Sequence, residues 1–322
     1  MPHRLSGLLR KSGLRGRTPV RPIGLGAWLV QAPWTDTRQR LRRLDDDAWL
    51  VQQGPRRQWH RVGPPEARSG LLVDLAAARA HMGAVQRGLG NWLAEEHVAH
   101  VLREARINCV LDVGANAGQY ARRLRTAGYT GRIVSFEPVA EFVELLEAAA
   151  ADDPEWRVLP YALGDSNTTA QINTTPGKRL SSLLPASDFG RKVFTEQLTA
   201  PTPETIEIRR LDGVLDEVVA GLSQPRVYLK MDTQGYDLQT FRGAGDRIGE
   251  VLAMQSEVAC VPIYDGMPRL PEQLSEYERQ GFEITGMYPV SRHAATLRVI
   301  EFDMVMVRAE ALTRAPARPS KE

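Results

Sequence analysis

A carboxylate and three turn-forming residues stand at every second position where an apolar segment ends: Asp112, Gly114, Asn116 and Gly118. The surrounding segment 110–120, Val-Leu-Asp-Val-Gly-Ala-Asn-Ala-Gly-Gln-Tyr, predicts a strand, a glycine turn and a helix. Such a unit presents bare backbone to a nucleotide-like ligand at the carboxyl end of a parallel sheet. The dinucleotide fingerprint Gly-x-Gly-x-x-Gly has another spacing, and a carboxylate is unfavourable beside a pyrophosphate. S-adenosylmethionine, whose amino acid end is cationic, therefore suits this turn better than NAD.

Further acids follow the next two predicted strands. Glu137 ends the second strand in Phe-Glu-Pro, 23 positions after Gly114, where a carboxylate can accept both hydroxyls of an adenosine ribose. The alternative for Glu137 is an acid that the helix dipole favours at a helix N-terminus. Gly164 and Asp165 end the third strand, where an adenine ring is expected. Asp165 can accept a hydrogen bond from the adenine amino group, although Gly-Asp is also an ordinary turn signal.

Five segments occur in the order seen in FkbM-type methyltransferases: 110–120, Phe-Glu-Pro at 136–138, Ala-Leu-Gly-Asp at 162–165, Ser-Ser-Leu at 181–183 and Leu-Lys-Met-Asp-Thr-Gln-Gly-Tyr-Asp at 229–237. Over about residues 90–308 the chain resembles this family. The resemblance implies a class I S-adenosylmethionine-dependent fold and methylation of a hydroxyl on a sugar, glycolipid or polyketide. It also implies that Asp112, Gly114, Asn116 and Gly118 hold the methionine end of the cofactor, Glu137 its ribose and Asp165 its adenine.

The chain departs from the family pattern after the fourth strand. The usual Asp-x-Glu-Gly-x-Glu is Asp232-Thr-Gln234-Gly-Tyr-Asp237 here, so one acid is lost and another is shortened. Because Gln cannot act as a base, residue 234 of this chain cannot take the part that a carboxylate could play at this position of the family pattern. No metal site is predicted, and a divalent ion at Asp232 and Asp237 is the less favoured arrangement.

Four residues are candidates for the chemistry of methyl transfer. An aliphatic hydroxyl is a poor nucleophile, so a base that takes its proton assists the transfer. Asp232 and Lys230 leave the carboxyl end of a central strand and Glu257 ends the next, so each is a candidate base or acceptor clamp. Lys230 is alternatively the ion-pair partner of Asp232. His293, in Ser-Arg-His-Ala-Ala, is either a base on a loop above the sheet or a histidine exposed to solvent.

Strands and helices alternate over some 200 residues and must position these side chains. The pattern predicts helices at 91–106, 117–127, 139–151 and 273–280, and strands at 107–113, 132–136, 156–163, 226–231, 251–258, 282–287 and 299–307, the last two antiparallel. Further β segments at 168–173 and 205–210 flank a polar stretch, 174–203, expected to be a functional loop. The fold class is therefore α/β, with a doubly wound, mostly parallel, Rossmann-like seven-stranded sheet.

The length of 322 residues allows one large domain and an appendage. Residues 1–66 contain 13 Lys and Arg against 5 Asp and Glu, a balance of +8 that leaves −6 for the remainder. We expect a basic, partly disordered extension over 1–70, a methyltransferase domain over 71–310 and a polar tail over 311–322. Two cysteines cannot build a disulfide framework, and no apolar run reaches the eighteen or so residues of a membrane span. A cytoplasmic location is expected.

The favoured hypothesis is an S-adenosylmethionine-dependent O-methyltransferase acting on a hydroxyl of a sugar, glycolipid or secondary metabolite. The basic extension raises RNA methylation as an alternative, although no Asn/Asp-Pro-Pro-aromatic motif is present and nucleic acid is the less favoured partner. The changes at 234 and 237 suggest a second alternative, a module that binds the cofactor but does not transfer the methyl group. An NAD oxidoreductase comes last, since the glycine spacing fails and the sequence contains no Tyr-x-x-x-Lys.

Overall fold

The computed structural model describes residues 82–175, 180–198 and 200–313, together with six short strands in the first 81 residues. Two compact units divide the chain, residues 1–85 and 86–322. In the first unit the strands form three antiparallel pairs: β1 (Val20–Gly24) with β2 (Ala27–Val30), β3 (Gln39–Arg43) with β4 (Trp49–Gln53), and β5 (Trp59–Val62) with β6 (Leu71–Asp74). The predictions of partial disorder in the extension and of a polar tail after residue 313 concern residues that the structure does not describe.

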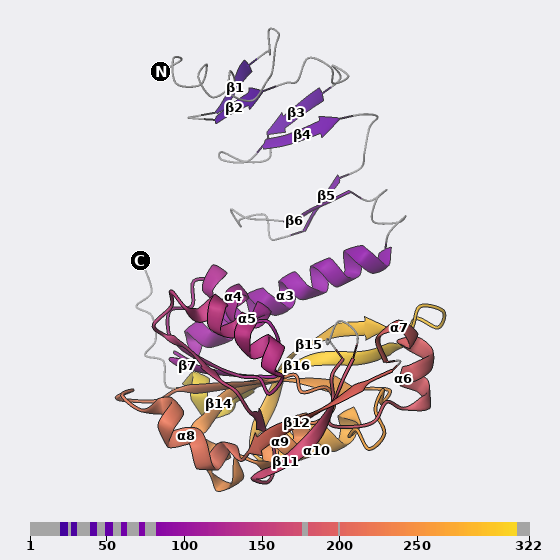
Figure 1. The fold of residues 1–322 in the computed structure, drawn as a ribbon. Helices are drawn as coiled ribbons and strands as arrows, with labels where there is room; N and C mark the ends of the chain where they lie inside the picture. The colour runs from indigo at the N-terminus through magenta and orange to yellow at the C-terminus, as the bar shows by residue number, and fades with distance from the viewer. Residues whose placement is uncertain are drawn as a thin grey trace. The chain divides into compact units, whose positions relative to one another are not determined.

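Seven strands form the central sheet of the second unit (Figure 1): β7 (Cys109–Val113), β8 (Arg132–Phe136), β9 (Trp156–Leu159), β13 (Val227–Met231), β14 (Val251–Ala259), β15 (Phe282–Arg292) and β16 (Val299–Arg308). Their spatial order is β15-β16-β14-β13-β7-β8-β9. The neighbours from β14 to β9 pair in parallel, and β16 is antiparallel to both β14 and β15. The predicted mostly parallel seven-stranded sheet is therefore confirmed, including its antiparallel final pair.

The helix α3 (Met82–Glu104) begins at the end of the first unit and continues into the second. The other described helices of the second unit are α4 (Gln119–Thr126), α5 (Ala140–Ala150), α6 (Asp188–Val193), α7 (Thr195–Leu198), α8 (Leu211–Val219), α9 (Asp237–Arg242), the 3-10 helix η1 (Gly245–Glu250), α10 (Leu270–Arg279) and α11 (Ala309–Thr313). None of the helices in the described part of the chain is long and apolar enough to cross a membrane.

Alternate residues of the central strands pack into two separate hydrophobic cores. Leu111 of β7 packs in a core with side chains of α8, α9 and α10. Its neighbour Val110 packs in the other core with side chains of α3, α4 and α5. Since β7 and β13 are buried along their whole length, both faces must be apolar. This explains why their sequences are nearly continuous apolar runs rather than alternating ones.

Two predicted elements differ from those in the structure. The strand predicted over 156–163 is two strands, β9 and β10 (Ala162–Leu163), because Pro160 between them has no N–H to continue a ladder. In addition, α3 begins nine residues before its predicted start at 91. The earlier start could not be predicted because glycine disfavours a helix, yet Gly88 and Gly90 both lie inside α3.

A second sheet of three strands lies beside the polar stretch. Its order is β10-β12-β11, with β11 (Thr168–Thr174) and β12 (Thr202–Arg209) antiparallel. The stretch between β11 and β12, expected to be a loop, contains the short helices α6 and α7. The sequence predicted both β segments but not that they leave the central sheet.

Gly243, at the end of α9, packs against the backbone of Gly164. A Cβ atom at 243 would lie 2.0 Å from the Gly164 carbonyl oxygen, whereas a Cβ at Gly213 in α8 would meet no atom within 4 Å. We therefore expect Gly243→Ala to lower the free energy of unfolding by about 1–3 kcal/mol through overpacking. Gly213→Ala is the matched control and should raise it by about 0.5–1 kcal/mol. Urea unfolding measures both, and equal stabilities of the two variants would contradict the packing account.

Candidate functional site

A cavity of about 570 Å³ opens where β7, β8 and β13 end at their carboxyl ends. Its polar lining includes Asn116, Glu137, Lys230, Asp232, Thr233, Gln234, Gln255 and Asp303, and its apolar lining includes Phe136, Phe142, Ala162, Leu163, Ile172 and Ile206. Ligands of open α/β sheets bind at this edge. The cavity therefore lies where the sequence placed the candidate site.

The turn after β7 bends tightly over the end of β13. Gly114, Asn116 and Gly118 have φ values of +74°, +50° and +79°, a region that favours glycine and tolerates asparagine. A Cβ at Gly114 would lie 2.1 Å from the carbonyl oxygen of Asp232, so no larger residue fits there. Gly114 and Asn116 line the cavity. Gly118 instead packs on Leu146 and Trp156, each 3.0 Å from where its Cβ would lie.

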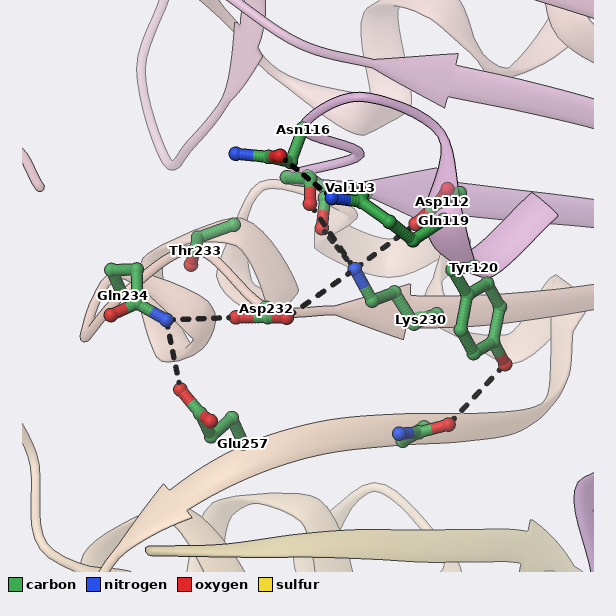
Figure 2. Close-up of polar contacts among 12 residues, drawn as sticks. Asp112, Val113, Asn116, Gln119, Tyr120, Lys230, Asp232, Thr233, Gln234 and Glu257 are labelled. Carbon is green, nitrogen blue, oxygen red and sulfur yellow. Dashed lines mark hydrogen bonds and ion pairs between the residues drawn. The ribbon is translucent and has the colours of Figure 1, made fainter. Parts of the chain in front are cut away.

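Lys230 joins the ends of β7 and β13 beneath this turn (Figure 2). Its Nζ lies 3.0 Å from Asp112 Oδ1 and 3.7 Å from Asp232 Oδ2. It also donates to the carbonyl oxygens of Gly114 at 3.2 Å and Val113 at 3.5 Å. Asp112 is fully buried and does not line the cavity, so its contact with the site is made through Lys230.

Glu137 lines the cavity at the end of β8 and is buried. Its Oε2 accepts from the amide of Asn116 at 2.8 Å, and its Oε1 accepts from the amide of Val139 at 3.0 Å. Burial raises the pKa of the Glu137 carboxyl to about 7, against the two amide hydrogen bonds and Lys230, which lower it. The carboxyl therefore binds both the glycine turn and the start of α5 while facing the cavity.

Three more acids gather beside Asp232, at the ends of β14 and β16. Burial and the neighbouring Glu301 raise the pKa of Glu257 well above its ordinary value. Burial likewise raises the pKa of Glu301, and it raises the pKa of Asp303 to about 6. Asp303 lines the cavity and Glu257 does not. The acids at 301 and 303 were missed in the sequence, although two carboxylates inside an apolar strand are a recognisable signal.

Asp237, the second altered position of the family pattern, is bound within the fold. Its Oδ1 accepts from the amide and hydroxyl of Thr233, and its Oδ2 accepts from the Ser256 hydroxyl and the Glu257 amide. These four donors hold the loop between β13 and α9 against β14. Among the described residues no group of His, Cys, Asp and Glu side chains is arranged to hold a metal ion.

Six predicted site residues do not line the cavity: Asp112, Gly118 and Glu257, described above, and Gly164, Asp165 and His293. Asp165 is exposed and Gly164 packs on Ile208 and Tyr236, and the structure places neither in the cavity lining. His293 lies in the turn between β15 and β16, where its Nδ1 is 3.0 Å from the Thr296 hydroxyl. The structure therefore brings together Asn116, Glu137, Lys230, Asp232 and Glu257, and leaves His293 outside.

The strand order, with an antiparallel seventh strand next to a parallel edge strand and a glycine turn after β7, defines a class I methyltransferase fold. Residues 112–284, more than half of the chain, match the family profile of the methyltransferase FkbM domain. The chain belongs to the FkbM methyltransferase family, which confirms the resemblance found in the sequence and identifies the protein as a methyltransferase.

Solved structures add weaker similarities. A DUF574 family protein from Streptomyces avermitilis has a TM-score of 0.38 and 14% identity, over 73% of this chain and 88% of the other. Aeropyrum pernix fibrillarin with bound S-adenosyl-L-methionine has a TM-score of 0.36 and 13% identity, over 90% and 100%. Magnesium protoporphyrin IX methyltransferase from Synechocystis has a TM-score of 0.36 and 9% identity, over 69% and 81%. Similarities this weak assign no ligand to this chain, and no curated protein sequence matches it.

The ion pair between Lys230 and Asp112 should be essential for stability. Lys230→Met leaves the buried Asp112 charge without its cation, and we expect the free energy of unfolding to fall by about 3–5 kcal/mol. Lys192→Met, at an exposed lysine of α6, is the control and should cost nothing measurable. In the double variant Lys230→Met/Asp112→Asn the loss should be smaller than the sum of the single losses. Additive losses in chemical unfolding would contradict direct pairing.

The raised pKa values predict how stability depends on pH. In the folded chain the pKa is about 7 for Glu137 and about 6 for Asp303, against ordinary values of 4.5 and 3.8. The folded chain thus binds more protons than the unfolded chain from about pH 4 to 7. The free energy of unfolding should therefore fall as the pH rises through this window and level off above it.

Asp303→Asn should reduce this decline, because one of the buried groups no longer ionises. Glu283→Gln, at an exposed acid of β15, should leave it unchanged. Thermal unfolding measured across the window compares the variants. A stability that rises with pH through the window in the unaltered protein would contradict the assignment.

Proposed function

We propose that the cavity binds S-adenosylmethionine and that the chain transfers its methyl group to a hydroxyl of a sugar, glycolipid or secondary metabolite. The supporting observation is that Glu137 accepts a hydrogen bond from the amide of Asn116 in the glycine turn, and that both residues line a cavity of about 570 Å³. Membership in the FkbM family supports methyl transfer as the reaction.

The residues of the cavity fit this cofactor in three places. Gly114, whose position leaves no room for a Cβ, and Asn116 give bare backbone for the methionine end. Glu137 offers carboxylate oxygens to the ribose hydroxyls. Phe142 and Leu163 line an apolar part suited to an adenine ring.

When bound, S-adenosylmethionine supplies a methyl group on a positively charged sulfur. The chain must hold the acceptor in line with that methyl group and take up the acceptor's proton. Asp232 is the candidate base, because it lines the cavity and 41% of its side chain is exposed. Lys230 is bound to Asp112 and two carbonyl oxygens, so it orients Asp232 rather than reacting. Glu257 is a poorer candidate, since it is buried and does not line the cavity.

The acceptor is tested with methyl-labelled S-adenosylmethionine and the full chain. Sugars, glycolipids, polyketides and RNA are offered separately, and we expect label in a hydroxyl-bearing small acceptor, held as an ether that survives mild base. Label in RNA, in an amount that falls steeply as the salt concentration rises and RNA binding weakens, would favour the RNA alternative. Cofactor binding with no transfer to any acceptor would favour the module without turnover.

Glu137 should determine cofactor affinity. Glu137→Gln removes the charge and one acceptor oxygen, so we expect about 10- to 100-fold weaker binding of S-adenosylmethionine in calorimetry. Glu147→Gln, at an exposed acid of α5, is the control and should bind as the unaltered protein does. Asp165→Asn tests the predicted contact with adenine in the same assay. Unchanged affinity in Glu137→Gln would refute the assignment of the ribose site.

A further inference from the structure

Gln234 occupies the position of an acid in the family pattern, and the structure places it between two carboxyl groups (Figure 2). Its Nε2 donates to Asp232 Oδ1 at 3.0 Å and to Glu257 Oε2 at 3.1 Å. The residue itself has a φ of +53° in the loop after β13 and lines the cavity. One side-chain amide thus bridges the ends of β13 and β14.

The orientation of this amide follows from its partners. Both N–H bonds face the carboxyl groups, and Gln234 Oε1 lies on the other side, 2.9 Å from the Tyr264 hydroxyl, which is also 3.1 Å from the carbonyl oxygen of Leu180. The reverse orientation would put the oxygen against two acceptors. In addition, the Ser182 hydroxyl donates to the Gln234 carbonyl oxygen at 2.6 Å and fixes the backbone. Side chain and backbone are therefore both held.

The charges around Asp232 explain why a neutral donor is needed here. Titratable groups interact with it from every element packed against it: Lys230 of β13, Glu257 of β14, Glu301 and Asp303 of β16, Asp237 of α9, and Tyr264 after β14. Asp112 of β7 pairs with Lys230 from the other side, and Arg123 faces Asp303. Acids outnumber cations in this set. A glutamate at 234 would add a further acid at about 3 Å from two others.

We propose that Gln234 is a positioning residue that holds the Asp232 carboxylate at the cavity wall by donating to Asp232 and Glu257 together. This inference rests on the proposed function, in which Asp232 takes the acceptor's proton. Lys230 lies on the Oδ2 side of Asp232 and Gln234 binds Oδ1, so both carboxylate oxygens have a partner. In place of the family's glutamate, which would repel Asp232, this chain has an amide that donates a hydrogen bond to it. The change from the family pattern is therefore compatible with turnover.

The test compares Gln234→Glu with the unaltered full chain. The substitution keeps the shape and adds an acid beside Asp232, so protonation of Asp232 should become easier. We expect the acidic limb of the kcat against pH profile to move upward by about one unit or more. Calorimetry measures the affinity of the same variant for S-adenosylmethionine, because Gln234 lines the cavity and a change in binding must be separated from the change in kcat. An unmoved limb with unchanged kcat would overturn the proposal.

Two further variants keep the test decisive. Gln234→Met removes the donor without adding charge and should lower kcat at least about tenfold, with a smaller movement of the limb, even if Gln234→Glu fails to fold. Gln171→Glu, at an exposed glutamine of β11, makes the same chemical change away from the cavity and should leave the profile unaltered. A Gln234→Met enzyme with the kcat of the unaltered chain would also overturn the proposal.

A readout without turnover separates this inference from the proposed function. Carbon NMR follows the side-chain carboxyl of residue 232 as the pH changes, in the unaltered chain and in Gln234→Glu. An upward movement of its titration midpoint in the variant supports the positioning role even if no acceptor is methylated, in which case the proposed function alone fails. Equal midpoints would refute the positioning role even if methyl transfer is found.

Discussion

The site depends on one buried cation, the ammonium group of Lys230. It lies beneath the glycine turn and binds the ends of β7 and β13 through Asp112, Asp232 and the carbonyl oxygens of Val113 and Gly114. A buried charge is costly unless it is paired and hydrogen-bonded, and these four acceptors offset that cost. Lys230 therefore links the glycine turn after β7 to the loop containing Asp232, and these two segments form facing parts of the cavity wall.

The surroundings of this cation are acidic, which has consequences for binding. Glu137 and Asp303 line the cavity, Glu257 and Glu301 lie close behind it, and burial raises the pKa values of all four. Such an arrangement weakens the folded chain as the pH rises but favours a ligand of positive charge. A cofactor with a cationic sulfur and an ammonium group matches this field, whereas a dinucleotide with two phosphates does not.

Local pattern was enough to predict the central sheet and much of the site. The turn at 114–118 and the acid at Glu137 are adjacent in sequence to the strands that position them, so their meeting follows from parallel pairing. The role of Gln234 could not be predicted, because its partners Glu257 and Tyr264 are brought to it by β14 and the segment after it. His293 was placed above the sheet from a loop pattern alone, and nothing local indicates that its turn ends outside the cavity lining.

The most direct test of the account is a crystal structure of the full chain with S-adenosylhomocysteine, the demethylated cofactor. The account predicts the amino acid end at Gly114 and Asn116, the ribose hydroxyls on Glu137, and the sulfur facing Asp232 across the cavity. Binding at another surface of the chain, or in this cavity with the ribose away from Glu137, would contradict it.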